Sequence, residues 1–263
     1  MEQKLIFEIS KSLENISRTA GKILLNFFRE HFEVKDKKGS ELVTTADIKS
    51  EEYIIKELKK RYPHIDVIAE ESSSKDVEKN NMFLIDPLDG THNFAYGIPF
   101  FCISIALQLE GEIVIGVVYD PVHKELFSCV KNRGTYLNGK KIKVSERIRL
   151  KDSILATGFP YIRKSKDNSN IPEFSEFLMK TRGLRRLGSA ALDLAYVACG
   201  RLDGFWEKYL NPWDIAAGGI LVIEAGGKVT NFSNCNWDVK KDNIIASNGK
   251  IHNEMFGIIK EFL

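Results

Sequence analysis

The feature that most constrains this chain is an apolar run that ends in two closely spaced acids. Residues 82–85 are Met-Phe-Leu-Ile, and Asp86-Pro87-Leu88-Asp89-Gly90-Thr91 follows at once. A buried strand would deliver Asp86 to a sheet edge, and the turn would aim Asp89 at the same point. Two carboxylates 4 Å apart repel by roughly 4 kcal/mol at an effective dielectric near 20. A fold tolerates this with a proton or a cation between them, and oxygen ligands of this kind suit magnesium.

Asp-Pro and Asp-Gly are also ordinary turn dipeptides, so this stretch alone would fit a plain strand-to-loop turn. Further acids lie at other predicted element ends. Glu70 and Glu71 close residues 66–69, and Asp214 opens a predicted helix. Each of them alone fits a solvated strand end or a helix cap. Together they predict carboxylates that converge on one cation cluster.

Length and composition fit one large domain, or two lobes that share a core. The chain has 263 residues, 43% hydrophobic content and a net charge of +2, so no strong field favours nucleic acid or membrane. The four cysteines lack zinc or redox spacing, which favours a reduced cytoplasm. The acids near the N-terminus disfavour a signal peptide, and no run reaches the ~20 apolar residues that span a bilayer. We expect a cytoplasmic protein without membrane contact.

Hydrophobic periodicity predicts helices in the first part of the chain, followed by an antiparallel meander. The helices cover residues 5–28 and about 47–62, the second stopped by Pro63. The Asn138-Gly139 dipeptide favours a tight hairpin. The predicted strands are 67–70, 82–86, 101–109, 113–119 and 125–130.

After about residue 145 strands and helices alternate, as in an α/β lobe. We therefore expect an N-terminal lobe over residues 1–145 and a C-terminal lobe over 146–263, with the site between them. The predicted strands are 153–157, 184–187, 204–209, 228–232 and 243–247. The predicted helices are 171–180, 189–199, 213–224 and a terminal one.

Two long segments resemble the signatures of the inositol monophosphatase family. They are residues 86–94, Asp-Pro-Leu-Asp-Gly-Thr-His-Asn-Phe, and residues 211–227, which begin Asn-Pro-Trp-Asp. The blocks 42–47, 69–72 and 188–195 fall at matching distances, so the resemblance covers nearly the whole chain. It implies an α+β fold, the layered α-β-α-β-α sandwich shared with fructose-1,6-bisphosphatase.

The resemblance also implies an activity, a Mg²⁺-dependent phosphomonoesterase that hydrolyses myo-inositol monophosphate through metal-activated water. The same chemistry on fructose 1,6-bisphosphate or 3′-phosphoadenosine 5′-phosphate is one alternative. A regulatory or RNA-associated member of the family is another. A small phosphorylated polyol as substrate, lithium inhibition and a homodimer are implied in the same way, and near-neutral charge disfavours nucleic acid.

The resemblance implies a role for each of a set of residues. Two or three Mg²⁺ ions would be held by one backbone carbonyl, that of Leu88, and by four carboxylates. The carboxylates are those of Glu70, Asp86, Asp89 and Asp214. Glu70, and Thr91 paired with Asp47, would activate or orient the water. The substrate would contact Leu88, Asp89, Gly90, Thr91, Arg185, Gly188, Ser189, Ala190, Glu207 and Asp214.

Three of these assignments compete with structural alternatives. Thr91 is also a candidate helix cap, and a helix that starts at Gly90 would offer N–H groups to phosphate. Glu207 could instead form an ion pair with Lys208 or with another neighbour. Arg186 competes with Arg185, and surface salt bridging is the alternative for both.

Overall fold

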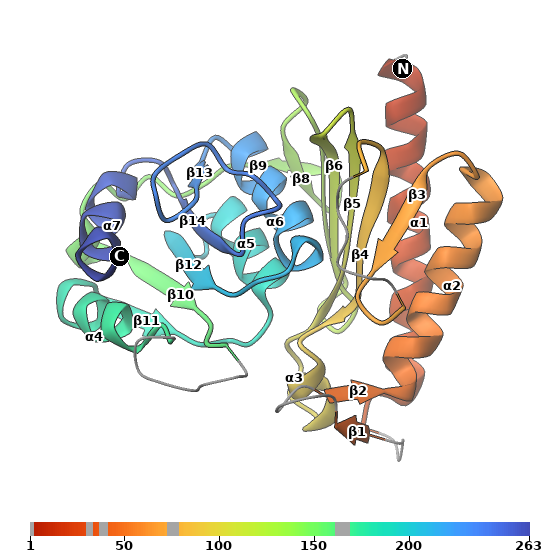
Figure 1. Ribbon diagram of the computed structural model, residues 1–263, viewed down its shortest axis with the longest axis horizontal. Helices are drawn as coiled ribbons and strands as arrows, with labels where there is room; N and C mark the ends of the chain where they lie inside the picture. The colour runs from red at the N-terminus through yellow and green to blue at the C-terminus, as the bar shows by residue number, and fades with distance from the viewer. Residues whose placement is uncertain (1–2, 30–33, 37–41, 73–78, 161–168) are drawn as a thin grey trace.

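The protein is built of five alternating layers of helix and sheet, seen edge-on in Figure 1. The computed structural model describes residues 3–29, 34–36, 42–72, 79–160 and 169–263. The outer layer is α1 (Gln3–Phe27) and α2 (Thr45–Arg61), the central layer α5 (Ala190–Ala198) and α6 (Pro212–Glu224), and the last layer α4 (Ile171–Lys180) and α7 (His252–Ile259). One sheet lies between the outer and the central helix layers, and the other lies between the central and the last helix layers. The predicted α-β-α-β-α sandwich is confirmed.

The first sheet has seven strands in the order β3-β4-β5-β6-β7-β8-β9. Their bounds are β3 Asp66–Ala69, β4 Met82–Asp89, β5 Cys102–Leu109, β6 Glu112–Asp120, β7 Glu125–Val130, β8 Thr135–Leu137 and β9 Lys140–Ile142. From β4 onward every pairing is antiparallel, as the predicted meander requires. The prediction is wrong for β3, which pairs parallel to β4 and thereby brings its C-terminal end beside Asp86.

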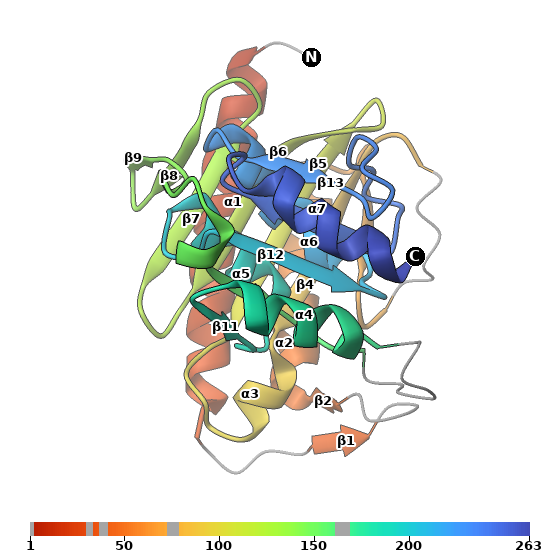
Figure 2. The ribbon, with the colours of Figure 1, turned by 90° about the vertical axis from the view of Figure 1, so that its left-hand side faces the viewer.

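The second sheet has five strands in the order β11-β10-β12-β14-β13. Their bounds are β10 Ile154–Thr157, β11 Gly183–Arg185, β12 Gly204–Lys208, β13 Lys228–Thr230 and β14 Asn243–Ser247. β10 pairs parallel to both of its neighbours, whereas β14 runs antiparallel to β12 and β13. Figure 2 shows α7 and α4 across the outer face of this sheet.

Three short features complete the described chain. β1 (Val34–Asp36) pairs with β2 (Leu42–Thr44), and α3 (Thr91–Ala95) follows β4 directly. Two 3-10 turns lie at Leu150–Asp152 and Lys260–Phe262. None of the helices in the described ranges is long and apolar enough to cross a bilayer.

Helix α6 is apolar on all sides because it lies between the two sheets. Its buried residues form one core with the facing strands, and Trp213 and Leu221 are among them. At Gly116 on β6 an added Cβ would lie 2.7 Å from the carbonyl oxygen of Ala217, so only glycine permits this close approach. This close packing of α6 on β6 holds the helix, and with it Asp214 in its first turn, against the first sheet.

A buried histidine in the outer layer makes stability depend on pH. His252 is fully buried, with Nε2 3.0 Å from Thr230 Oγ1 and Nδ1 2.9 Å from Ser247 Oγ. Burial, and then the charge of Lys228, lower its pKa to about 4 from 6.5. Below pH 6.5 this histidine therefore binds a proton in the unfolded chain, whereas in the folded protein it stays neutral down to about pH 4.

We expect the free energy of unfolding to fall as the pH drops from 6.5 toward 4, and His252→Gln to flatten that part of the profile. Urea unfolding at several pH values between 4.5 and 7.5 measures the difference between the two proteins. Parallel profiles for wild type and His252→Gln would contradict this assignment.

Candidate metal and phosphate site

Strand β4 changes register where its two acids lie. Asp86 pairs with Ser104 of β5, and the next pair is Asp89 with Cys102, so the ladder is irregular between them. Pro87 has no N–H for a ladder, which makes this break natural. The bulge lets both acids approach one end of the sheet instead of pointing to opposite faces.

Asp86 is buried, and its Oδ1 accepts the N–H of Leu88 at 2.9 Å. Burial raises its pKa well above the usual range, and the charges of Glu70, Asp89 and Asp214 raise it further. Glu70 directly follows β3, where its N–H donates to Ile85 O at 3.2 Å. The predicted acids thus lie close enough to disfavour one another's charge.

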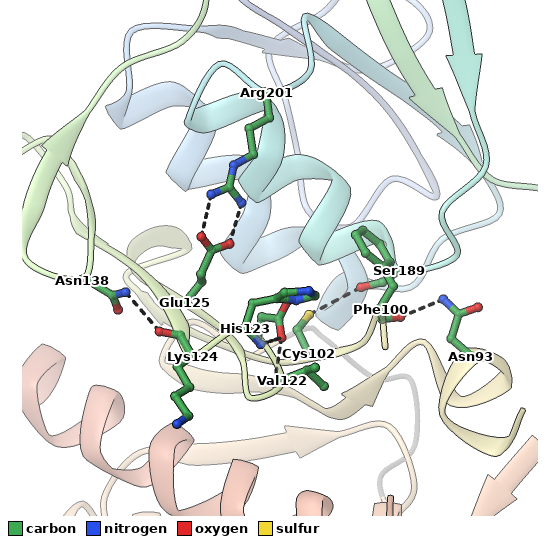
Figure 3. A network of polar contacts seen from close by, with 11 residues as sticks. Asn93, Phe100, Cys102, Val122, His123, Lys124, Glu125, Asn138, Ser189 and Arg201 are labelled. Carbon is green, nitrogen blue, oxygen red and sulfur yellow. Dashed lines mark hydrogen bonds and ion pairs between the residues drawn. The ribbon is translucent and has the colours of Figure 1, made fainter. Parts of the chain in front are cut away.

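Asp89 lies at the N-terminus of α5. Its Oδ2 accepts from Ser189 Oγ and from the Ala191 N–H, both at 2.7 Å. Burial raises its pKa to about 6, although these donors oppose the shift. Figure 3 shows Cys102 beside Ser189, with Sγ 3.5 Å from Oγ, so β5 and α5 meet behind Asp89. An acid at this helix end is stabilised by the helix dipole.

Asp214 is the third residue of α6 and part of a capping box. Its Oδ2 accepts the Asn211 N–H at 2.7 Å, while the Asn211 side chain caps the helix in return. Burial raises the pKa of Asp214 well above its usual range, and the charges of Glu70 and Asp89 add to this. The helix-cap reading of this acid is therefore correct, and it is compatible with a place in the acidic cluster.

Protein donors bind Oδ1 of Asp86 and Oδ2 of Asp89 and Asp214, and the Ala190 N–H also faces Asp89. In the part of the chain that the structure describes, the second carboxylate oxygens of Asp86 and Asp214 receive no hydrogen bond and are available to a cation. These residues fit a divalent ion chemically, because it would remove the mutual repulsion. Within the described residues, no three His, Cys, Asp or Glu side chains already form a group that could hold an ion.

Thr91 and Asp47 meet beside this cluster. The Thr91 hydroxyl lies 3.1 Å from Asp47 Oδ1 and 3.0 Å from Leu88 O. Asp47 also accepts the Thr44 N–H at 2.8 Å, in a capping box in which Thr44 is the N-cap of α2, and burial raises the pKa of Asp47 to about 6. The alternative of Thr91 as a helix cap is wrong, because α3 begins after Gly90 without a side-chain cap. With five residues, α3 carries little dipole toward phosphate.

Two glycines allow the turn after β4 and the segment before α5 to approach each other closely. Gly90 has a φ of +99°, and an added Cβ would lie 3.0 Å from Phe100 O and 3.3 Å from Gly188 O. Gly188 has a φ of +98°, and a Cβ there would lie 2.5 Å from Arg186 Nη1. Both positions require glycine, because the backbone is left-handed and the space is filled. Ser189 and Ala190 follow as the N-cap and first residue of α5.

The arginine that faces the site is Arg186. Its charge opposes the rise in pKa that burial imposes on Asp89, Asp193 and Glu207. Both arginines are exposed, but Nη1 of Arg185, which the resemblance nominated, donates to its neighbour Leu184 O. Nothing in the local sequence separates two adjacent arginines, so only the fold could decide between them.

Glu207 is buried on β12, and burial raises its pKa to about 8. The alternative pairing with Lys208 is wrong, because Lys208 forms an ion pair with Glu173 on α4. A Cβ at Gly158 would overlap the Glu207 carboxylate. Asp193, to which the sequence assigned no role, is buried nearby, and burial followed by the charge of Glu207 raises its pKa well above the usual range.

Side chains that the sequence did not single out also join segments that are distant in the chain. Asn93 Nδ2 donates to Phe100 O at 2.7 Å and to Leu187 O at 2.8 Å. Arg201 reaches across to Glu125 with two bonds of 2.5 Å (Figure 3). Asn93 lies inside the first signature, at residues 86–94, so the sequence pattern could have indicated its importance.

A comparison with known protein families decides the identity. The sequence model of the Inositol monophosphatase family matches residues 7–262 of this chain. The chain belongs to this family. Membership makes it an enzyme of the phosphatase class, and the resemblance seen in the two signatures is confirmed.

Relatives of this inositol monophosphatase family member carry two kinds of name. Inositol-1-monophosphatase of Synechocystis is 42% identical over 90% of this chain and 83% of its own length. Nus factor SuhB of Escherichia coli K12 is 39% identical over 95% of this chain and 96% of its own.

Solved structures agree on the fold of this family member. The suhB protein of Bartonella henselae superposes with a TM-score of 0.91 at 39% identity, over 97% of this chain and all of that one. An IMPase/NADP phosphatase complexed with Mg²⁺ and phosphate gives 0.80 at 25% identity, over 97% and 93%.

Proposed function

We propose that this protein is a Mg²⁺-dependent phosphomonoesterase that acts on myo-inositol monophosphate. The observation that carries the proposal is the convergence of Asp86, Asp89 and Asp214 with Glu70: the charges of Glu70 and Asp89 raise the pKa of both Asp86 and Asp214. The Mg²⁺ and phosphate in the IMPase/NADP phosphatase structure support the choice of metal. The site would lie between a lobe of residues 1–145 and one of 146–263.

Glu70, Asp86, Asp89, Asp214 and the Leu88 carbonyl would hold Mg²⁺. When bound, Mg²⁺ supplies positive charge against the phosphate and lowers the pKa of a nearby water. The Leu88 carbonyl lies 3.0 Å from the Thr91 hydroxyl, so ligation would leave Asp47 as the remaining acceptor for that proton.

Thr91 and Asp47 would orient the attacking water. Because the Thr91 hydroxyl would donate its hydrogen bond to Asp47 Oδ1, Thr91 Oγ1 would have a lone pair free to accept a hydrogen bond from the water. Asp47 is held on its other oxygen by Thr44, so the Thr91 hydroxyl is kept in one orientation.

Glu207 would bind a hydroxyl of the leaving alcohol. Its pKa of about 8 leaves the carboxyl largely protonated at neutral pH, so it donates as well as accepts a hydrogen bond. That suits a polyol, whose hydroxyls also do both.

A substrate panel with and without Mg²⁺ tests the proposal. We expect Mg²⁺-dependent release of phosphate from inositol 1-phosphate to exceed release from fructose 1,6-bisphosphate and 3′-phosphoadenosine 5′-phosphate. Faster turnover of either of the latter would keep the chemistry and replace the substrate.

A regulatory, RNA-associated role is the second candidate, because the Escherichia coli relative is named a Nus factor. It predicts salt-dependent binding of RNA. RNA binding without Mg²⁺-dependent hydrolysis would favour it over the phosphatase proposal.

We expect Arg186→Ala to raise the KM for inositol phosphate about fivefold, in line with ~1 kcal/mol for an exposed charge. Arg185→Ala, one residue away, should leave KM unchanged, because its guanidinium faces the Leu184 carbonyl. Steady-state kinetics at saturating Mg²⁺ compare the two variants. An equal or reversed effect would show that Arg186 does not act at the site.

A further inference from the structure

Helix α2 carries three buried polar side chains on one face. Asp47, Ser50 and Glu51 are 1%, 0% and 4% exposed, and their spacing of three and four residues places them in a row toward the first sheet. Buried polar groups of this kind almost always have a hydrogen-bond partner. Each of these three finds its partner in a different segment of the proposed metal site.

Ser50 contacts the strand that carries Asp86 and Asp89. Its Oγ donates to the carbonyl of Pro87 at 3.0 Å. Pro87 lies where the register between β4 and β5 shifts. It has no paired residue on β5, because the pairing passes from Asp86 directly to Asp89. The hydroxyl of Ser50 therefore fixes the backbone between the two acids where the sheet does not.

Glu51 contacts the segment that carries Glu70. Its Oε2 accepts the Glu71 N–H at 2.9 Å. The parallel pairing of β3 with β4 ends at Ala69 and Ile85, and Glu70 N–H makes the last bond to β4. The anchor from Glu51 thus begins one residue after the sheet hydrogen bonds end.

Asp47 completes the row through its contact with Thr91, 3.1 Å away. Consecutive turns of one helix therefore hold the backbone next to Glu70, the backbone between Asp86 and Asp89, and the residue that orients the water. A helix is a rigid spacer with a fixed rise per turn, whereas the three segments lie at strand ends.

We infer that Ser50 and Glu51 are positioning residues, which set the distance between Glu70 and the Asp86–Asp89 pair so that the carboxylates enclose Mg²⁺ together. The inference rests on the proposed function. It assigns a role to two residues that would touch neither metal nor substrate.

The test compares Glu51→Ala with Glu51→Gln and with Glu52→Ala. Glutamine keeps an oxygen that can accept the Glu71 N–H, whereas alanine removes it. Glu52 is the exposed neighbour on the same helix and serves as the matched control. Calorimetric titration with Mg²⁺ measures binding directly, and amide hydrogen exchange over residues 69–72 reports the anchor itself.

We expect Glu51→Ala to weaken Mg²⁺ binding about tenfold, with faster exchange at Glu71 and a kcat at saturating Mg²⁺ close to wild type. Glu51→Gln should stay within about twofold, and Glu52→Ala should match wild type. Unchanged Mg²⁺ affinity in Glu51→Ala, or equal damage in Glu51→Gln, would overturn the inference.

Ser50→Ala provides a second test if Glu51→Ala does not fold. We expect about a threefold to tenfold loss of Mg²⁺ affinity, because the carbonyl of Pro87 loses its donor. Wild-type affinity in Ser50→Ala would contradict the inference. Wild-type protein that binds no Mg²⁺ would instead reject the proposed function, so the two failures are distinguishable.

Discussion

Replacing Asp214 with asparagine is expected to abolish most of the activity and leave the fold intact. Loss of a partner behind a metal ligand already costs about 10–100-fold, so loss of a proposed ligand should cost about 100-fold or more in turnover. The asparagine carbonyl can still accept the Asn211 N–H, which preserves the cap of α6. Steady-state turnover across Mg²⁺ concentrations measures the loss.

The same substitution should stabilise the metal-free protein. The pKa of Asp214 is raised by burial and by Glu70 and Asp89. Above about pH 4, Asp214 loses its proton in the unfolded chain but keeps it in the folded protein. The free energy of unfolding therefore falls as the pH rises from about 4 toward the pKa of Asp214 in the folded protein. Asp214→Asn removes this loss, and urea unfolding without metal at pH 8 should show a higher midpoint.

Glu254→Gln is the matched control, because Glu254 is exposed and takes the same third position of helix α7. It should change neither turnover nor stability. Near-normal turnover in Asp214→Asn would contradict its role as a ligand, and so would destabilisation of the metal-free protein.

Replacing Gly90 with alanine is expected to produce the second large effect. Alanine in the left-handed region costs about 1–2 kcal/mol. Its Cβ would also press on Phe100 O and Gly188 O, at 3.0 and 3.3 Å. A displacement of this turn moves Asp89 and Thr91, and misplacement of about 1 Å can cost ~100-fold in rate. Turnover at saturating Mg²⁺ and the thermal midpoint are the measurements.

Gly139→Ala separates strain from crowding. Gly139 has a φ of +80°, close to that of a left-handed turn, but a Cβ there meets nothing within 4 Å. It should lose similar backbone energy and keep full activity. If Gly90→Ala retained activity equal to Gly139→Ala, the close approach of Gly90 to Phe100 and Gly188 would have no part in catalysis.

The regular elements were predictable because their signals are local. The apolar spacing of residues 5–28 produced α1, and Asn138-Gly139 produced the β8–β9 hairpin. The signature at 86–91 indicated a strand that ends in a turn, which β4 and Gly90 form. Thr44 and Asp47 form a capping box, a signal that would have placed the start of α2 correctly.

The rest depended on contacts between distant segments. The parallel pairing of β3 with β4 cannot be read from either strand, because the apolar residues of a strand do not specify the direction of its neighbour. Lys208 pairs with Glu173, 35 positions earlier in the chain, and not with its neighbour Glu207. The choice between Arg185 and Arg186 depends on which of them the turn at Gly188 directs toward Asp89 and Glu207.

Crystals grown with Mn²⁺ in place of Mg²⁺ give the most direct test of the central claim, through the anomalous scattering of the metal. We predict peaks bounded by Glu70, Asp86, Asp89 and Asp214, with the Leu88 carbonyl as a further ligand. The Asp214→Asn crystal should lose at least one of these peaks. Peaks at other carboxylates, with none between these four, would contradict the account.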